Sequence, residues 1–349
     1  MIVPLLISLP FLAGLLVVIP GLYDSTMMSR LAIYPLIGAF VLLSGRKRIV
    51  RTHLFVGLLM ALLPAISLLW SQSPVGGIPF AVRWFSFGMM VAGFSGVVKE
   101  HGTDVFLDGM SACAAAVSLI IVTGLTETVL GNPNRAGMIL ALGFVSTVAR
   151  FNRKKLFSWI PMILIAAGLV LSQFITGWIA ALAGILVLAG KKPLRIPVWL
   201  PVTVMIVGQA AITTLPETAG DVGPTLELRS RIWRYSLKLT SDSFPLGIGT
   251  GSARLHIYTR GEPELRQLAG DGKRVDYLHS EPLSLVTEQG IFGFIAIVFI
   301  LYWLFKKCST PVLAGLLVAF WPVFSSDLPL ATPLGGTAAA MFLAMVPGL

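Results

Sequence analysis

Charged residues are scarce in this chain of 349 residues. They make up 12% of it, whereas a typical soluble domain has about 25%, and hydrophobic residues reach 56% with a mean hydropathy of +0.86. This composition excludes an ordinary soluble protein and predicts an integral membrane protein. The net charge of +10 does not indicate a nucleic-acid partner, because most basic residues lie in short loops between apolar runs, as expected beside membrane lipids.

Groups that could bind a metal or a nucleotide are also few. The two cysteines, Cys113 and Cys308, fall within or at the end of apolar segments, and their spacing indicates neither a disulfide framework nor a zinc site. The glycine-rich segment 245–251 lacks the Lys and Ser/Thr of a nucleotide P-loop. We interpret it as a structural turn, although its backbone amides could also face an anion. We expect no metal and no other cofactor.

Apolar runs of membrane-spanning length account for most of the chain. They lie at about 2–20, 31–44, 54–70, 78–98, 105–124, 136–150, 156–172, 175–190, 196–214, 281–304, 311–325 and 333–348. We therefore expect an all-α polytopic membrane protein with about twelve transmembrane helices: helices 1–9 in residues 1–214, a long insert at 215–279, and helices 10–12 in residues 280–349. The first run lacks a basic n-region and a clear cleavage site, so we interpret it as a retained span.

Basic residues in the short loops predict the orientation. The loops after runs two, four, six, eight and ten carry Arg46, Lys47, Arg48, Arg51, Lys99, Arg150, Arg153, Lys154, Lys155, Lys191, Lys192, Arg195, Lys306 and Lys307. The short loops of the other side have only Arg30 and Arg135. The positive-inside rule then places both termini in the cytoplasm and the insert outside.

The insert at 215–279 holds nine of the 26 Lys and Arg residues. Within it Leu228, Ile232, Tyr235 and Leu239 recur at helical spacing. This pattern predicts an amphipathic helix whose apolar stripe lies on the membrane or on the ends of other helices.

Two sets of side chains flank this stripe. Arg231, Arg234 and Lys238 share one flank and are typical of a basic face that contacts lipid headgroups. Arg229 and Trp233 share the other flank, where the guanidinium can stack on the indole or present a fork to a phosphate.

Further candidates lie at the outer lip of the predicted helices. His279 directly precedes the tenth run; it could be a general base oriented by Glu281, or an interfacial residue with a structural partner. Arg83 lies inside the fourth run and Arg135 at the mouth of the sixth. Charges at such depth commonly face a cavity or a partner, although both could also reach the outer headgroups. Several arginines with one histidine suit a diphosphate ligand.

Three motifs, in this order, resemble those of the O-antigen ligase and O-antigen polymerase superfamily of bacterial membrane glycosyltransferases. The segments are 131–137 (GNPNRAG, with Asn134 and Arg135), Arg229 with Trp233 followed by PLGIG at 245–249, and His279-Ser280-Glu281 followed by EQGIFG at 288–293. The predicted topology, with its long insert before the tenth helix, resembles that of the family as well.

The resemblance implies inverting, metal-independent transfer of a glycan at the periplasmic face of the bacterial inner membrane. The donor would be a glycan on undecaprenyl diphosphate, and the acceptor a hydroxyl of a glycan or of a lipid A core. His279 would deprotonate the acceptor and Arg229 would bind the diphosphate. The candidate substrate-binding residues are Arg229, Arg83, Arg135, Asn134, Trp233 and Glu281.

One position departs from the family pattern. Ile175 stands where members commonly carry an arginine, so a second diphosphate-binding arginine is missing unless Arg83 or Arg135 supplies it. The competing hypothesis is a transporter or flippase of an anionic lipid-linked glycan. Ionisable groups would then be expected across the bilayer midplane, whereas here they cluster at the outer lip. A purely structural envelope protein would leave Arg229 and His279 without a role.

Overall fold

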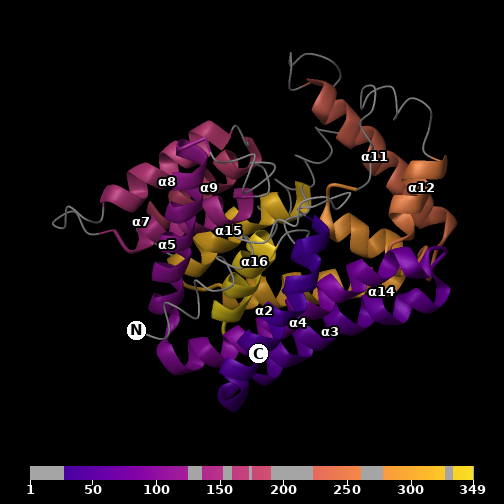
Figure 1. Cartoon of the computed structure of the whole chain (residues 1–349), viewed down its shortest axis with the longest axis horizontal. Helices are drawn as coiled ribbons and strands as arrows, with labels where there is room; N and C mark the ends of the chain where they lie inside the picture. Colours follow the sequence, from indigo (N-terminus) through magenta and orange to yellow (C-terminus); the bar gives the residue numbers. More distant parts are fainter. Residues whose placement is uncertain are drawn as a thin grey trace.

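The protein is helical throughout the part of the chain that the structure describes. This computed structural model describes residues 27–124, 136–151, 159–172, 175–189, 223–260, 278–326 and 333–348, and every regular element in these ranges is a helix (Figure 1). The all-α class is therefore confirmed. Helices occur in ten of the twelve predicted runs, and the runs at 2–20 and 196–214 lie outside the described residues.

The bounds of the helices follow the apolar runs closely. They are α2 Met27–Gly45, α3 Arg51–Ser67, α4 Pro74–His101, α5 Thr103–Val122, α7 Gly137–Ala149, α8 Trp159–Ser172, α9 Ile175–Ala189, α11 Gly223–Asp242, α12 Ser252–Arg260, α14 Glu281–Lys307, α15 Pro311–Ser326 and α16 Pro333–Met345. Four spans, Arg51–Trp70, Pro74–His101, Thr103–Val122 and Glu281–Lys307, are long and apolar enough to cross a membrane. The count of twelve transmembrane helices stays a prediction.

Helix α4 packs closely against α2 and α3. A methyl group at Gly57 of α3 would lie 2.5 Å from the carbonyl oxygen of Gly88, and a methyl group at Gly96 of α4 would run into the backbone of Gly45. Small residues allow helix backbones to approach in a membrane, where van der Waals packing replaces the hydrophobic effect. The result is a tightly packed group of three helices whose interior holds the fully buried Phe87.

Contacts bring several basic loops to one end of this bundle. The Val50 N–H donates to the Ser95 hydroxyl at 3.2 Å, which joins the start of α3 to the last turns of α4. The rings of His53 and Trp303 pack edge to face with centroids 5.1 Å apart. This contact places the C-terminal end of α14 beside the start of α3. The basic residues of the second and tenth loops therefore lie near one another.

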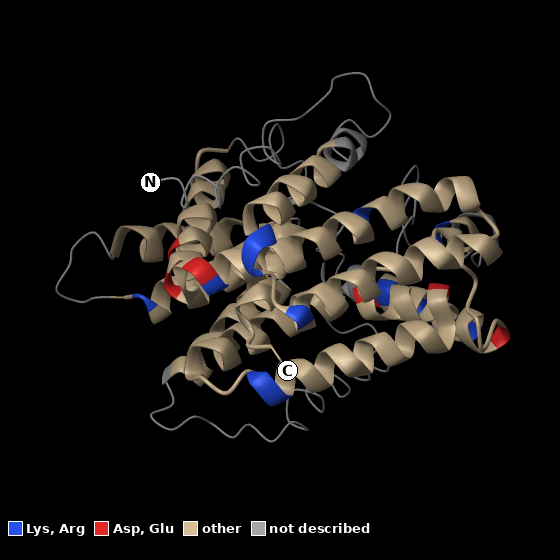
Figure 2. Cartoon of the chain, turned by 90° about the horizontal axis from the view of Figure 1, so that it is seen from below, with Lys and Arg blue, Asp and Glu red and all other residues tan. Residues whose placement is uncertain are grey.

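The loop after α7 reaches that end as well. Arg150 forms a salt bridge of 2.8 Å with Asp104, and α5 begins directly after the end of α4 at Gly102. These contacts bring together the described part of the predicted basic set, namely Arg46, Lys47, Arg48, Arg51, Lys99, Arg150, Lys306 and Lys307. Figure 2 shows the described Lys and Arg residues in blue on the helices. This arrangement agrees with the positive-inside pattern, while the side that faces the cytoplasm stays a prediction.

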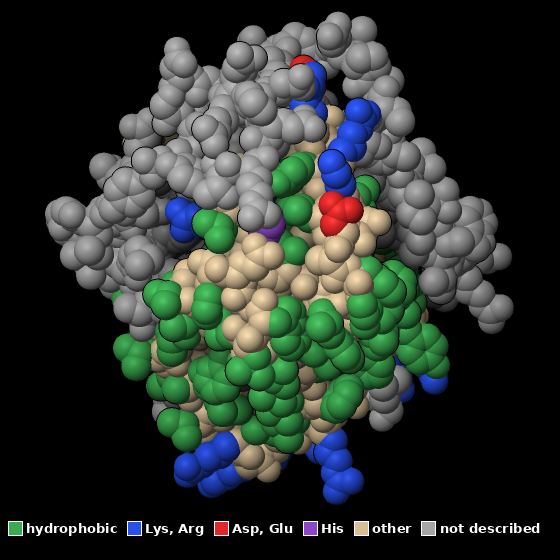
Figure 3. All heavy atoms as spheres, turned by 90° about the vertical axis from the view of Figure 1, so that its right-hand side faces the viewer, with side chains coloured by type: hydrophobic (Ala, Val, Ile, Leu, Met, Phe, Trp, Pro, Cys, Tyr) green, Lys and Arg blue, Asp and Glu red, His purple; other side chains and the backbone are tan. Residues whose placement is uncertain are grey.

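A broad apolar surface covers the outside of α3 and α14. Its exposed members on these two helices include Leu54, Phe55, Leu58, Leu62, Ile66, Phe292, Phe294, Ile295, Val298 and Tyr302. Figure 3 shows apolar side chains spread over this face of the molecule, with Lys and Arg side chains along its lower border. Contiguous apolar surface of this extent is typical of a protein that faces lipid.

The described part of the insert forms a second, smaller core at the other end. Ile232 and Trp233 of α11 are buried with Ile248, Ile257 and Leu278. The other stripe residues, Leu228, Tyr235 and Leu239, pack against this small core. The predicted amphipathic helix is therefore confirmed, and it lies on the first turns of α14 beside α12 (Figure 1).

Candidate functional site

Helix α14 is broken near its N-terminus. Gly290 has φ 59° and ψ −133°, which interrupts the helix between residues 281–289 and the longer part that follows. The N–H of Ile291 donates to the carbonyl of Pro245 at 2.8 Å, and the N–H of Gly249 donates to the carbonyl of Glu288 at 2.8 Å. Backbone groups freed by a helix break need such partners when they are buried. The glycine-rich segment 245–251, the glycine loop, supplies them.

The amides of the glycine loop bind groups of the protein itself. The Gly251 N–H donates to the Glu288 carboxylate at 3.0 Å, and the Thr250 N–H donates to the Ser67 hydroxyl at 3.2 Å. The structure therefore agrees with the interpretation of this loop as a structural turn. The group that faces its Gly251 amide is the buried carboxyl of Glu288.

A buried polar network fastens the loop to both neighbouring helices. The Thr250 hydroxyl lies 2.6 Å from the Ser67 hydroxyl of α3 and accepts a hydrogen bond of 2.9 Å from the amide nitrogen of Gln289 in α14. All three residues are buried. Buried hydrogen bonds of this kind fix relative positions, because breaking one leaves a polar atom unsatisfied. The start of α14 is thus held against α3.

His279 lies on a backbone turn that leads into α14. Its φ is 50°, a left-handed value that no other non-glycine residue adopts among those the structure describes. The hydroxyl of Ser280 caps the helix by accepting from the Leu283 N–H at 3.3 Å. The indole N–H of Trp233 donates to the Leu278 carbonyl at 2.8 Å from the opposite side. Strained backbone persists where its surroundings hold it, and such strain is frequent at functional sites.

A buried ion pair anchors the first turn of α14. Arg83 of α4 and Glu281 lie 3.4 Å apart, with side-chain exposures of 6% and 0%. The guanidinium carbon of Arg83 lies 5.2 Å from the ring centre of Phe80 and 5.8 Å from that of Trp84. Arg83 therefore faces partners inside the protein, which was one of the alternatives left open by the sequence. Because Glu281 follows His279 by two positions, the ion pair also restrains the histidine turn.

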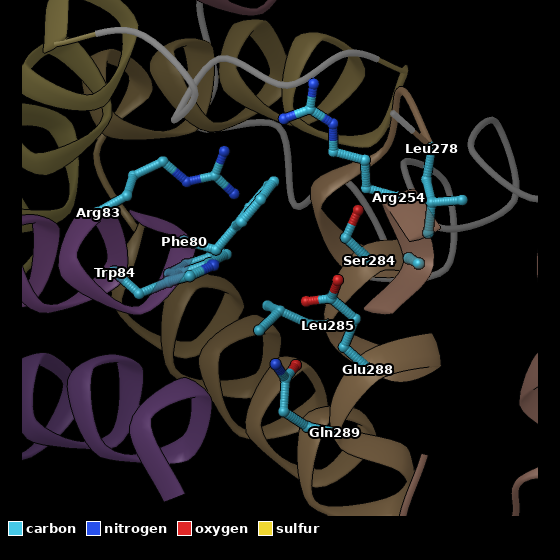
Figure 4. A pocket seen from close by; sticks show the side chains of 10 residues that line it. Phe80, Arg83, Trp84, Arg254, Leu278, Ser284, Leu285, Glu288 and Gln289 are labelled. Carbon is cyan, nitrogen blue, oxygen red and sulfur yellow. The ribbon is translucent and has the colours of Figure 1, made fainter. Parts of the chain in front are cut away.

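A pocket opens beside this ion pair. It is lined by Phe80, Arg83, Trp84, Ala253, Arg254, Leu278, Ser284, Leu285, Glu288 and Gln289, and it is partly open to the outside. Figure 4 shows Arg83 and Arg254 reaching it from different helices, with Ser284, Glu288 and Gln289 on the side of α14. Aromatic walls, two guanidiniums and several hydrogen-bonding groups make it suitable for a polar, anionic ligand.

The structure brings together only part of the predicted site. Arg83 lines the pocket and pairs with Glu281, and His279 is the chain neighbour of the lining residue Leu278. Trp233 is 2% exposed, so it contributes by supporting the turn rather than by facing the pocket. Arg229 is half-buried on α11 and does not line the pocket. Asn134 and Arg135 lie outside the described residues, as does the side chain of Ile175.

The predicted set of site residues left out four polar residues of the pocket, Arg254, Ser284, Glu288 and Gln289, although Glu288 and Gln289 belong to the motif at 288–293. Arg254 is one of the nine basic residues of the insert, and no motif distinguishes it from the others. Glu288 carried a usable signal, since a carboxylate inside an apolar helix commonly has a structural or functional partner. Its partners, the Gly251 amide and the pocket, are known only from the fold.

The cationic side chains that line the pocket are both arginines. Within the ranges that the structure describes, no group of three His, Cys, Asp or Glu side chains is placed to hold a metal ion. Arginine side chains are therefore the groups at the pocket that can neutralise an anion.

No protein-family model matches the chain, and no curated protein matches it either.

Proposed function

We propose that this protein transfers a glycan from an undecaprenyl-diphosphate donor to an acceptor hydroxyl, with inversion at the anomeric carbon and without a metal ion. The observation that carries the proposal is the buried Arg83–Glu281 pair, which lies at a polar pocket and fastens the helix that His279 introduces. The motif resemblance supports the same chemistry. In this proposal the acceptor is a glycan or a lipid A core, and the reaction takes place at the periplasmic face of the bacterial inner membrane.

The reaction needs one base and one site for a departing anion. The imidazole of His279 takes the proton of the acceptor hydroxyl while that oxygen forms a bond to the anomeric carbon. The bond from the anomeric carbon to the diphosphate oxygen breaks, and the lipid diphosphate leaves with the bonding electrons. Guanidinium groups offset the negative charge that develops on the leaving group, because a fixed cation in a partly dry site acts without reorganisation.

The surroundings of His279 suit a base that must reach a substrate. Its side chain is half-buried, while the residues on both sides of it, Leu278 and Ser280, are buried. The Trp233 hydrogen bond and the Ser280 cap hold the backbone on either side. A base held in this way keeps its position and orientation while substrates bind and products leave.

The decisive experiment uses the purified full chain in detergent or in vesicles. It is incubated with an undecaprenyl-diphosphate glycan and a panel of acceptors, namely lipid A core, free oligosaccharide and the donor itself, and the products are identified by mass spectrometry. A covalent glycan product with released undecaprenyl diphosphate supports the proposal. Movement of intact donor across vesicles, with no product from any acceptor, overturns it in favour of a transporter or flippase.

A further inference from the structure

Large apolar side chains are exposed where α11 ends and the glycine loop begins. Phe244 is 63% exposed and Leu246 is 47% exposed, while Leu237, in the last turns of α11, is 56% exposed. None of the three belongs to the small core around Trp233. Grouped apolar side chains on a protein surface mark a contact with a partner or with a membrane. Residues 243–247, the apolar turn, therefore indicate a contact that the insert itself does not provide.

Backbone contacts place the apolar turn beside the lipid-facing side of α14. The N–H of Ile291 donates to the carbonyl of Pro245 at 2.8 Å, directly after the break at Gly290. The next residue of α14, Phe292, is exposed and belongs to the broad apolar surface of α3 and α14. The apolar turn thus continues a surface that is itself typical of lipid contact.

The length of α14 gives the depth of the apolar turn. The helix from Gly290 to Lys307 rises at most about 25 Å across the membrane, at about 1.5 Å per residue, and less where it is tilted. Its last turn carries Lys306 and Lys307, which belong to the basic set. The hydrocarbon core of a bilayer is about 30 Å thick. The turn therefore lies in the part of that core nearest to the insert, or at its boundary.

Exposed basic residues accompany the apolar turn. Arg234 and Lys238 are exposed and four positions apart on α11, and Figure 3 shows basic side chains beyond the upper border of the apolar face. Basic side chains beside apolar ones are typical of a segment that lies in a membrane interface. From these positions we infer that the apolar turn is a membrane anchor of the insert: Phe244 and Leu246 enter the acyl chains of the nearer leaflet, with Leu237 at the interface.

The anchor holds the insert on the membrane surface. Helix α11 also supports the backbone before His279, through the bond of Trp233 to Leu278. Release of the apolar turn from the lipid therefore disturbs the histidine turn as well. The contact with lipid does not depend on whether the protein transfers a glycan.

The test measures the depth of nitroxide labels on the purified full chain in vesicles of phosphatidylethanolamine and phosphatidylglycerol. Single cysteines are placed in a background without Cys113 and Cys308, as Phe244→Cys, Leu246→Cys, Ile295→Cys and Asp242→Cys. Power-saturation EPR compares collisions with oxygen, which concentrates in the bilayer, and with a water-soluble nickel chelate. We expect the oxygen-to-nickel ratio at positions 244 and 246 to be several-fold higher than at 242, and close to that at 295 on the lipid face.

Two outcomes would overturn the anchor. Nickel collisions at 244 and 246 as frequent as at 242 would mean that the turn stands in water. Protection of both positions from oxygen and nickel alike would mean that protein covers the turn. Dipolar broadening between the labels of two copies would then identify a second copy of the chain as the occupant.

A variant without the apolar side chains tests what the turn holds. Phe244→Ser with Leu246→Ser is expected to raise nickel collisions several-fold at a label on Leu237→Cys, because the end of α11 is released from the lipid. Leu69→Ser, which alters an exposed leucine outside the turn, is the matched control and should leave that label unchanged. Thermal midpoints in detergent verify that both variants are folded. An unchanged label in a folded double variant would refute the anchoring role, and if the double variant does not fold, the label depths at 244 and 246 decide alone.

Discussion

The indole N–H of Trp233 lies 2.8 Å from the carbonyl oxygen of Leu278. Through this bond a helix of the insert supports the backbone immediately before His279, whose φ of 50° needs external support. The bond connects residues 45 positions apart in the chain. It couples the placement of the proposed base to the packing of α11 on α14.

We expect Trp233→Phe to reduce transfer by about ten- to a hundredfold, because it removes this support while keeping an aromatic ring in the small core. Trp303→Phe is the matched control: its N–H bonds the carbonyl of Pro347 at 3.0 Å at the other end of the molecule. Each variant should lose about 1 kcal/mol of stability, the usual net value of one hydrogen bond. Thermal midpoints and turnover are measured together, and equal turnover in the two variants would contradict a role for Trp233 in positioning His279.

The Arg83–Glu281 pair predicts a strongly non-additive mutant cycle. Arg83→Gln alone or Glu281→Gln alone should each cost about 3–5 kcal/mol, because a buried charge is left without its partner. The double variant should cost less than the sum of the two single variants. Unfolding is followed in detergent by denaturant titration. Arg150→Gln, which breaks exposed ion pairs with Asp104 and Asp108, is expected to cost no more than about 2 kcal/mol, and a loss there as large as in Arg83→Gln would argue against the buried pair.

Gly290 is predicted to tolerate no side chain. A methyl group there would run into the Pro245 carbonyl, and φ 59° with ψ −133° is a conformation that glycine alone adopts readily. Gly102 also has a positive φ of 83°, but a methyl group there meets nothing within 4 Å. We therefore expect Gly102→Ala to cost about 1–2 kcal/mol, and Gly290→Ala to cost more and to lower the yield of folded protein. Equal thermal midpoints for the two variants would refute the description of the glycine loop.

Two residues are tested by substitution: His279, the proposed base, and Arg229, which the sequence predicted to bind the diphosphate. His279→Ala should leave the protein folded and lower transfer by about 10²–10⁴-fold, the range of one general base. Arg229→Lys should reduce transfer strongly if the guanidinium fork binds phosphate, because a lysine is a point charge. Arg234→Lys, on an exposed face of the same helix, is the control and should retain activity. Wild-type turnover by His279→Ala would end the assignment of His279 as the base.

Cysteine labelling checks the orientation. Burial raises the pKa of the Cys308 thiol to about 12, so the thiol stays protonated at neutral pH. It therefore reacts slowly with maleimides, and the reaction becomes faster only as the pH approaches the pKa. In a background without Cys113 and Cys308, Arg48→Cys and Asp242→Cys place exposed thiols near opposite ends of the molecule. In right-side-out vesicles we expect label at position 242 alone until the membrane is opened. Equal labelling of both positions would contradict the predicted orientation.

Most of the helical architecture could be predicted from the sequence, because hydrophobic runs and their period are local properties. The fourth run, predicted at 78–98, is the helix Pro74–His101, and the stripe of Leu228, Ile232, Tyr235 and Leu239 faces the small core. Charge scarcity alone indicated a membrane protein. Loop charges indicated which ends of the helices lie together.

The site itself could be predicted only in fragments. Arg83 and Glu281 were recognised as unusual charges, but the two are 198 positions apart, and no local pattern specifies which buried carboxylate meets which arginine. Trp233 was expected beside a ligand, and packing placed it under the histidine turn. No sequence motif includes Arg254, and it lines the pocket only because α12 packs against α4 and α14.

The sequence by itself determined the helices, their apolar faces and the class of the protein, because these depend on neighbours within a few residues along the chain. The tertiary structure decided the ion pair, the break at Gly290 with its glycine loop, and the pocket between α4, α12 and α14. Those features depend on how helices that are distant in the sequence pack against one another. A partial rotation of one helix about its axis would bring different side chains together.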